Sequence, residues 1–190
     1  MTTKLDIRPF WDLSYGIYVV TSLKGNDYNA QISNTVTQIT QYSPLISISV
    51  NKHSLTHEYI KFSNVFGVST VEKDCPLEFI DLIGFQSGRD VNKLENLNYE
   101  IGENTCPLIT DNCLSYIEAE VINSIDVDTH TLFIGKATAS KYLKEGEPMT
   151  FTHYSKLSNN RVSERSPIPS LKYSNSVYVK HGNICKPANQ

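Results

Sequence analysis

The sequence predicts a mainly β fold with two inserted helices, arranged as a closed or partly closed antiparallel barrel. Short runs that alternate apolar and polar residues, or that are rich in β-branched residues, recur through most of the 190-residue chain. Turn-forming residues separate these runs. Only two segments show the helical spacing of apolar residues, and many strands joined by turns favour a barrel over a parallel, doubly wound sheet.

The first elements expected are the two strands of a hairpin. Tyr15–Leu23 is rich in aromatic and β-branched residues, and Lys24–Asp27 supplies a turn. Ala30–Thr40 then alternates with a period of two, and polar residues occur on both of its faces. Polar groups therefore line a sheet that ought to be half buried.

The next segment passes from a strand directly into a helix. Leu45–Val50 is typical of a buried strand, and helical spacing starts at Leu55 after Ser54, which is expected to be the N-cap. A helix N-terminus offers unpaired N–H groups and partial positive charge, to which Lys52, Ser54 and Thr56 add a cation and two hydroxyls. The turn predicts an anion site, such as one for a phosphate, with a merely capped surface helix as the alternative.

A short strand and a second helix follow. Phe66–Val71 is expected to be the strand. Cys75–Phe85 is expected to form the helix, with Pro76 in its first turn and its end near Gly84.

The last long elements are two alternating segments that predict an antiparallel hairpin. They are Cys113–Val127 and Thr129–Leu143, with the turn around Asp128. From about residue 158 the chain is polar and without periodicity, so we expect one domain over residues 1–157 and a linker and tail over 158–190. The tail carries one weak strand pattern, Ser176–Val179.

The composition argues against several classes of function. A formal net charge of -3 gives no basic excess, so no nucleic-acid partner is expected. No apolar run approaches the roughly 20 residues that span a bilayer, and no N-terminal segment resembles a signal peptide, so no membrane association and a cytoplasmic location are expected.

Four cysteines occur at irregular spacings and are expected to be reduced thiols rather than metal ligands. They are Cys75, Cys106, Cys113 and Cys185, with no CxxC pair among them, so no metal site is expected. Cys75 lies at the start of a predicted helix, where a thiol can be acidified, although an unreactive small residue is the alternative.

Five motifs in order resemble the flavin reductase family, whose fold is the FMN-binding split barrel. They are "LSYGIYVVTS", "NAQISNTVTQIT", "SVNKHSLTHEYIK", "FIDLIGFQSGRDVNK" and "DVDTHTLFIGKA". The resemblance runs from about Leu13 to Tyr154 and is strongest to the branch that forms the flavin domain of high-molecular-weight rubredoxins. It implies a homodimer of split barrels, each binding FMN near the dimer interface and passing electrons from NAD(P)H to an acceptor.

The resemblance also implies which residues contact FMN. One set would grip the phosphate and ribityl chain: Asn51, Lys52 and Thr56. A second would lie along the isoalloxazine edge: Gln31, Ser33, Asn34, Thr35 and Val36. A third, from the loop after the second helix, would reach toward the phosphate end: Ser87, Arg89 and Lys93. For Arg89 the alternative is a surface ion pair with Asp90.

His130 matches a histidine that this family carries near the nicotinamide site, and it is the candidate for positioning NADH. A solvated histidine at a hairpin turn is the alternative. Hydride transfer from nicotinamide to flavin needs no protein acid or base at the reacting carbon, so the protein would contribute stacking, distance and electrostatics. Tyr154 and His57 are weaker candidates for the cofactor pocket.

The resemblance leaves the electron acceptor open. The tail lacks the paired cysteines of a rubredoxin iron site, so the acceptor would be a separate rubredoxin-type protein, free flavin or another small acceptor. Three other readings remain: an FMN-binding electron shuttle that does not oxidise NAD(P)H, an FMN-dependent oxidase of the pyridoxamine-phosphate type, and a degenerate member that binds no flavin.

Overall fold

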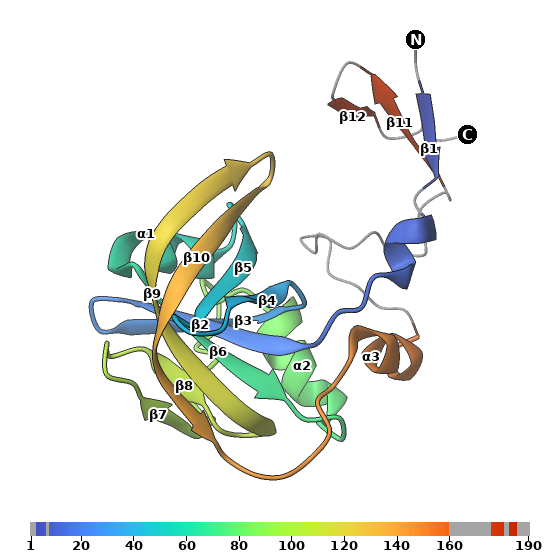
Figure 1. The fold of residues 1–190 in the computed structure, drawn as a ribbon. Helices are drawn as coiled ribbons and strands as arrows, with labels where there is room; N and C mark the ends of the chain where they lie inside the picture. The colour runs from blue at the N-terminus through green and yellow to red at the C-terminus, as the bar shows by residue number, and fades with distance from the viewer. Residues whose placement is uncertain (1–2, 7, 160–175, 181–182, 186–190) are drawn as a thin grey trace.

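The computed structural model describes residues 3–6, 8–159, 176–180 and 183–185, and the mainly β prediction is confirmed. One seven-stranded sheet, antiparallel at every pairing, dominates the fold (Figure 1). In spatial order its strands are β3 (Asp27–Ser33), β2 (Tyr18–Lys24), β6 (Val65–Val71), β9 (Cys113–Val127), β10 (His130–Tyr142), β5 (Leu45–Asn51) and β4 (Val36–Thr40).

Shorter elements surround this sheet. The helical segments are η1 (Arg8–Asp12, a 3-10 helix), α1 (Leu55–Ser63), α2 (Leu77–Phe85) and α3 (Phe151–Leu157). A two-stranded sheet is formed by β7 (Tyr99–Ile101) and β8 (Pro107–Ile109), and a three-stranded sheet by β1 (Thr3–Asp6), β11 (Ser176–Lys180) and β12 (Asn183–Cys185). Strand β11 coincides with the weak strand expected in the tail. Most of the expected linker, residues 160–175, lies outside the described residues.

The prediction of one strand over Ala30–Thr40 is wrong. The chain forms two strands, β3 and β4, separated at Asn34 and Thr35. These strands are consecutive in the chain but occupy opposite edges of the sheet, so the sheet must curl until its edges meet. The Ser49 N–H donates to the Thr35 carbonyl (3.2 Å) at this crossing. Side-chain alternation continues through both strands. The sequence pattern therefore does not show that β3 pairs with β2 whereas β4 pairs with β5.

The two predicted helices are confirmed with small shifts. Ser54 caps α1, since its Oγ accepts a hydrogen bond from the His57 N–H (3.2 Å). Pro76 is the N-cap of α2 rather than a residue of its first turn, and the helix continues to Phe85.

Helix α3 was not predicted because seven residues are too few to show a helical period. Its Thr150 N-cap, whose Oγ1 accepts from the His153 N–H (3.2 Å), was the available signal.

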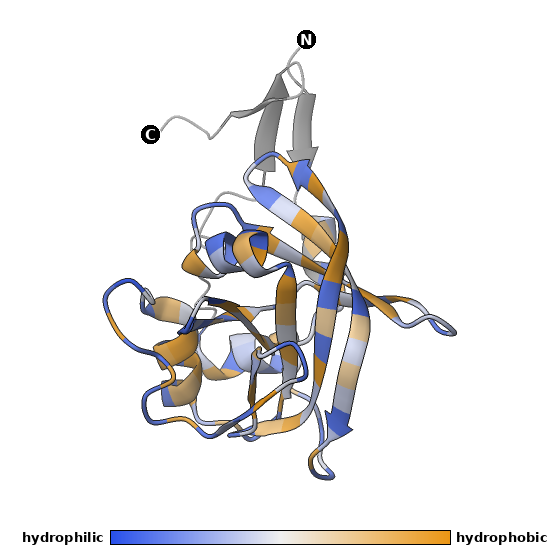
Figure 2. Ribbon diagram, turned by 90° about the vertical axis from the view of Figure 1, so that its left-hand side faces the viewer, coloured by the Kyte–Doolittle hydropathy of each residue, from blue (hydrophilic) through white to orange (hydrophobic). Residues whose placement is uncertain are grey.

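The sheet buries apolar side chains on both faces. Val20, Phe66 and Phe133 belong to one buried cluster, together with Ile60 of α1. The second cluster lies on the other face under α2 and α3 and includes Val19, whose side chain points away from that of Val20. Figure 2 shows the resulting alternation of hydrophobic and hydrophilic residues along the long strands.

Burial makes the thiols of Cys75, Cys106 and Cys113 poor nucleophiles. Burial raises the pKa of Cys75 to about 12 and that of Cys106 to about 12, and Cys113 is buried as well. The acidified-thiol alternative for Cys75 is therefore wrong, because desolvation outweighs the helix start.

Candidate functional site

A pocket opens where β3, β5, the start of α1, the end of α2 and α3 converge. Residues from Ile17 to Tyr154 line it, so it is assembled from nearly the whole described length of the chain. One end is polar and the other apolar, which gives the pocket a direction.

The polar end is built on the first turn of α1. The N–H groups of Leu55 and Thr56 have no partner within the helix because they lie in its first turn. The Thr56 side chain is buried, and its Oγ1 accepts a hydrogen bond from Asn29 Nδ2 (2.8 Å). Ser87 and Gly88, from the loop after α2, line the same end. Helix N–H groups surrounded by neutral hydroxyls and an amide are suited to hold an anion.

The middle of the pocket is lined by polar side chains of β3 and β5. Gln31, Ser33 and Asn34 come from β3 and the residue after it, and Ser49 and Asn51 come from β5. The Oε1 atom of Gln31 is buried and has no hydrogen-bond partner. A buried amide oxygen without a donor is costly, so this atom is suited to accept a hydrogen bond from a ligand.

His130 enters the pocket from the start of β10, directly opposite Asn51 in the strand register. Its Nδ1 lies 2.8 Å from Thr129 Oγ1. Strand pairing therefore holds the histidine beside the polar wall of β5.

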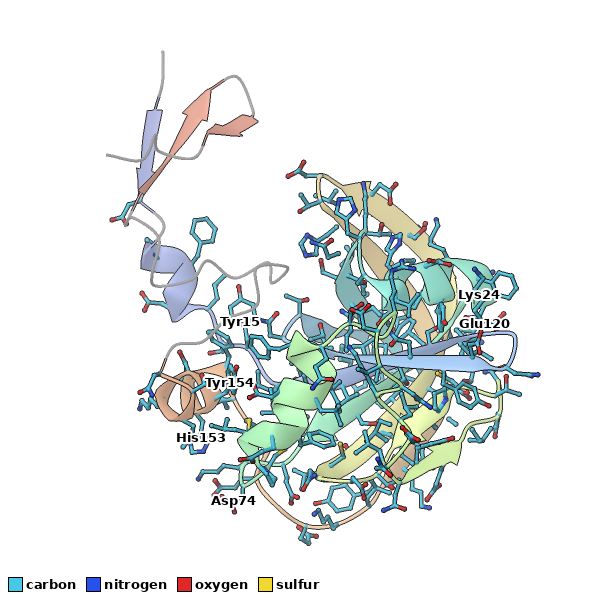
Figure 3. The ribbon with its side chains drawn as sticks, turned by 180° about the vertical axis from the view of Figure 1, so that it is seen from behind. Tyr15, Lys24, Asp74, Glu120, His153 and Tyr154 are labelled. Atoms are coloured by element: carbon cyan, nitrogen blue, oxygen red, sulfur yellow. The ribbon has the colours of Figure 1, made fainter. Side chains whose placement is uncertain are left out.

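The far end of the pocket is apolar and aromatic. Ile17, Ile80, Phe151 and Tyr154 line it. The Phe151 N–H donates to the Tyr15 carbonyl (2.8 Å), and the rings of Tyr15 and Phe151 pack edge to face at 6.4 Å. Figure 3 shows Tyr15 and Tyr154 close to one another beside α3. Aromatic and branched side chains at this end are suited to pack against a flat, apolar ring.

The pocket lining contains a cationic side chain but no carboxylate. No Asp or Glu occurs among the lining residues, and Lys93 is the only Lys or Arg among them. Lys93 is 5% exposed, and its ammonium donates to the carbonyls of Ala30 (2.9 Å) and Ile83 (2.7 Å). Its charge is therefore held under the middle of the pocket rather than on the surface of the loop.

Eight of the twelve predicted site residues line this pocket: His130, Gln31, Ser33, Asn34, Asn51, Thr56, Ser87 and Lys93. The other four lie elsewhere. Thr35 Oγ1 donates to the Ser49 carbonyl (3.2 Å), and Val36 is the first residue of β4. Lys52 Nζ lies 3.7 Å from Asp126 Oδ2, at the edge of the hairpin.

Arg89 faces away from the pocket. Its Nη2 lies 3.1 Å from Glu58, which also pairs with Lys24 (2.7 Å), so its partner is not the Asp90 carboxylate considered from the sequence. It lines a separate polar groove with Tyr28 and Tyr59.

Sequence reasoning missed several lining residues. Asn29, Ser49, Gln86, Gly88 and Phe151 gave no signal, because each falls in an ordinary strand, loop or helix pattern. Ser54, which the sequence predicts both as the cap of α1 and as a hydroxyl beside the anion site, lines the pocket.

His57 points to the hairpin rather than the pocket. Its Nε2 lies 2.8 Å from the buried Thr131 Oγ1, which donates to Asp126 Oδ1 (2.7 Å). Since that hydroxyl gives its one hydrogen to Asp126, His57 must donate from Nε2, and its Nδ1 is the proton-accepting atom. Burial, followed by the charge of Lys61, lowers the pKa of His57.

Within the described part of the chain, no group of three or more His, Cys, Asp or Glu side chains is arranged to hold a metal ion. No helix there is long and apolar enough to cross a membrane.

Comparison with known proteins identifies the family. The flavin reductase like domain model matches residues 11–158. High molecular weight rubredoxin of Moorella thermoacetica is 37% identical over 163 residues, which cover 86% of this chain and 71% of that protein. Ferric-chelate reductase (NAD(P)H) of Archaeoglobus fulgidus is 39% identical over 150 residues, which cover 79% of this chain and 89% of that protein.

Solved structures give the same fold. The NADH:FAD oxidoreductase SgcE6 of Streptomyces globisporus superposes with a TM-score of 0.69 at 23% identity, over 77% of this chain and 86% of that one. Flavoredoxin of Methanosarcina acetivorans superposes with a TM-score of 0.64 at 18% identity, over 93% and 87%. The split-barrel prediction is confirmed. A family match over residues 11–158, with relatives above 30% identity across most of their length, shows that the chain belongs to the flavin reductase-like family of oxidoreductases.

Proposed function

We propose that the chain binds FMN in this pocket, accepts a hydride from NAD(P)H and passes the electrons to a separate acceptor. The observation that carries the proposal is the difference in polarity between the two ends of the pocket. An anion site at the start of α1 and an aromatic end at α3 are joined by a polar wall that contains no carboxylate. A molecule with a phosphate at one end and a flat ring at the other matches this order.

The chain's residues have distinct roles in the proposal. The Leu55 and Thr56 N–H groups and the Thr56 and Ser87 hydroxyls would hold the phosphate. Gln31, Ser33 and Asn34 would contact the ring edge, and the buried Gln31 Oε1 would gain a donor there. Bound FMN would supply the acceptor for a hydride. His130 would orient the nicotinamide beside the ring rather than exchange a proton with it.

The four predicted site residues that do not line the pocket would contact FMN only after a side-chain movement, or would act indirectly. Lys52 would leave Asp126 to reach the phosphate, a movement of one partly exposed side chain. Thr35 and Val36 would support the ring wall through the β3–β4 crossing. Arg89 would have to break its pair with Glu58, so we expect it to contribute less than Thr56.

A homodimer is supported by the outer part of the β9–β10 hairpin. Ile122, Ile125 and Val127 are 54%, 49% and 55% exposed there. Ile125 is paired with Leu132 and Val127 with His130, so this apolar surface continues to the mouth of the pocket. A second copy placed on it would bury the apolar side chains and cover the open side of the pocket.

The acceptor is proposed from the relatives. One relative is named a rubredoxin and another a ferric-chelate reductase. A rubredoxin-type protein, a ferric chelate and free flavin are therefore the acceptors to test first.

The proposal is tested by titrating the protein with FMN under argon and then adding NADH or NADPH. Saturable binding followed by bleaching of the flavin absorbance is the expected result. Binding without bleaching by either nucleotide would favour the electron shuttle, and no binding of FMN would contradict the assignment of the pocket.

A further inference from the structure

Gln31 carries a buried hydrogen-bond acceptor that no donor among the described residues satisfies. Its Oε1 is shielded from water, and its side chain lines the middle of the pocket. The backbone at this point is fixed, because Gln31 pairs with Val20 of β2, which is fully buried. An unpaired acceptor in a fixed wall costs free energy that a bound donor would recover.

The two neighbours of Gln31 on the same face of β3 are already engaged by the protein. Asn29 Nδ2 donates to Thr56 Oγ1 (2.8 Å) at the polar end of the pocket. Ser33 Oγ accepts from the Thr35 N–H (3.4 Å), which leaves the Ser33 O–H to donate. The strand therefore presents an acceptor at Gln31 next to a donor at Ser33.

The proposed phosphate cannot be the partner of Gln31 Oε1. An ionised phosphate offers only acceptors, and an amide oxygen is an acceptor too. Gln31 also lies two residues beyond Asn29 along β3, which places it about 7 Å from the polar end. That length fits the ribityl chain of FMN, so either the ring edge or a ribityl hydroxyl would reach Gln31.

The ring edge matches the strand better than a single hydroxyl does. The oxidised isoalloxazine ring has one N–H group, at N3, and a carbonyl stands on either side of it. An acceptor beside a donor, as Gln31 and Ser33 present them, is the complement of that edge. The opposite, dimethylbenzene edge has no donor, so it would leave Gln31 Oε1 unpaired.

From this geometry we infer that Gln31 orients the flavin: its Oε1 accepts from the ring N3–H, while Ser33 donates to a neighbouring ring carbonyl. The inference rests on the proposed function. It makes Gln31 a specificity-determining residue, because the pocket then selects rings that carry an N–H group between two carbonyls. The pyrimidine edge lies against β3, and the dimethylbenzene edge points away from that strand.

The experiment compares FMN with N3-methyl FMN, which lacks the N3 hydrogen, by fluorescence titration. We expect the wild-type protein to bind FMN about ten- to a hundredfold more tightly, the range for a buried acceptor that loses its donor. Gln31→Ala removes the acceptor and makes room for the methyl group. It should therefore bring the two dissociation constants to within about threefold of one another.

A second readout reports the hydrogen bond itself. FMN labelled at N3 with an NMR-active nitrogen isotope should show, in the wild-type complex, an N3 proton resonance that is protected from exchange with water. That resonance should shift or disappear in Gln31→Ala, because its acceptor is gone. Gln38→Ala is the matched control: Gln38 is an exposed glutamine of β4 that donates from Nε2 to the Thr40 carbonyl (3.1 Å), and its replacement should change neither the ratio nor the resonance.

Other results would overturn the inference. Equal binding of the two flavins by the wild type, or the absence of a protected N3 proton in its complex, would each do so, and neither result needs the variant to fold. An unchanged ratio in folded Gln31→Ala would mean that other atoms exclude the methyl group, while the reductase proposal would stand. Failure of the wild type to bind FMN would overturn both proposals, whereas binding without oxidation of NAD(P)H would overturn only the proposed donor.

Discussion

Ser54 shows how one side chain prepares the candidate site. Its Oγ accepts from the His57 N–H (3.2 Å) and donates to the Asn51 carbonyl (2.9 Å), so it caps α1 and fixes the turn from β5. The cap satisfies the His57 N–H and leaves the N–H groups of Leu55 and Thr56 directed at the pocket end. This function could be predicted from the sequence because capping is local.

Thr56→Val should weaken FMN binding. The replacement keeps the shape of the buried side chain but removes the hydroxyl that faces the proposed phosphate and accepts from Asn29. Because the phosphate of FMN is an anion, loss of one such hydrogen bond should raise the dissociation constant about tenfold or more. Fluorescence titration with FMN measures it. Thr37→Val, an exposed change on β4, should bind as the wild type does, and equal binding by both variants would contradict the phosphate assignment.

His57 should make folding stability depend on pH. Its folded-state pKa is lowered, first by burial, so the unfolded chain takes up a proton at higher pH than the folded chain does. The free energy of unfolding should therefore fall as the pH drops below about 6.5, the ordinary value for histidine. Urea unfolding between pH 7.5 and 5 should show a smaller fall for His57→Gln.

The exposed His53→Gln should keep the wild-type slope. An unchanged slope in His57→Gln would show that other groups cause the acid sensitivity.

At the scale of elements, local pattern predicted the strands and long helices but not their partners. The hairpin of β9 and β10 was predicted with its turn at Asp128, which adopts a positive φ of 45°. The break between β3 and β4 was not predicted, because alternation is the same on either side of Asn34 and Thr35. Helix α3 was missed for its length, although its Tyr154 forms one end of the pocket.

Gly135→Ala should destabilise the barrel. Gly135 lies at a register shift between β9 and β10, and a Cβ there would come within 2.6 Å of the Phe66 ring and 2.9 Å of the Ala119 Cβ. Both neighbours are fully buried and cannot move away cheaply, so we expect a loss of about 1–3 kcal/mol. Urea unfolding measures it, with the exposed Ser140→Ala on the same strand as the control. A loss below about 0.5 kcal/mol, the range of ordinary surface changes, would show that the sheet relaxes at the shift.

At the scale of the whole molecule, the candidate site depends on the closure of the sheet. The crossing at Asn34 and Thr35 lets β3 and β5 contribute to one pocket although they lie near opposite edges of the sheet. The pocket lies next to the exposed apolar surface of the β9–β10 hairpin, because Val127 of that surface is paired with His130 of the pocket lining. A second copy of the chain is proposed to bind this surface.

Ile125→Asp should convert the proposed dimer into a monomer. A carboxylate in the centre of an apolar interface would be desolvated without a partner, which weakens association by several kcal/mol. Sedimentation equilibrium should give the mass of one chain for the variant and of two for the wild type. Ile101→Asp on β7, where the isoleucine is 51% exposed against 49% for Ile125, is the control and should stay dimeric. A wild-type protein that sediments as one chain would contradict the dimer.

Short-range patterns in the sequence were enough to predict the mainly β class, the capped helix start at the polar end of the pocket and most of the polar residues that line the pocket. These features depend on neighbours within a few residues, so the spacing of residue types along the sequence is enough to predict them. Contacts between segments distant in the chain set which strands pair, where the sheet closes and which way long side chains turn. Lys93 turned inward to two carbonyls and Arg89 outward to Glu58, although both come from one polar loop. The reason is that the direction of a long cationic side chain depends on where hydrogen-bond acceptors and carboxylates lie, and these groups belong to elements distant in the chain.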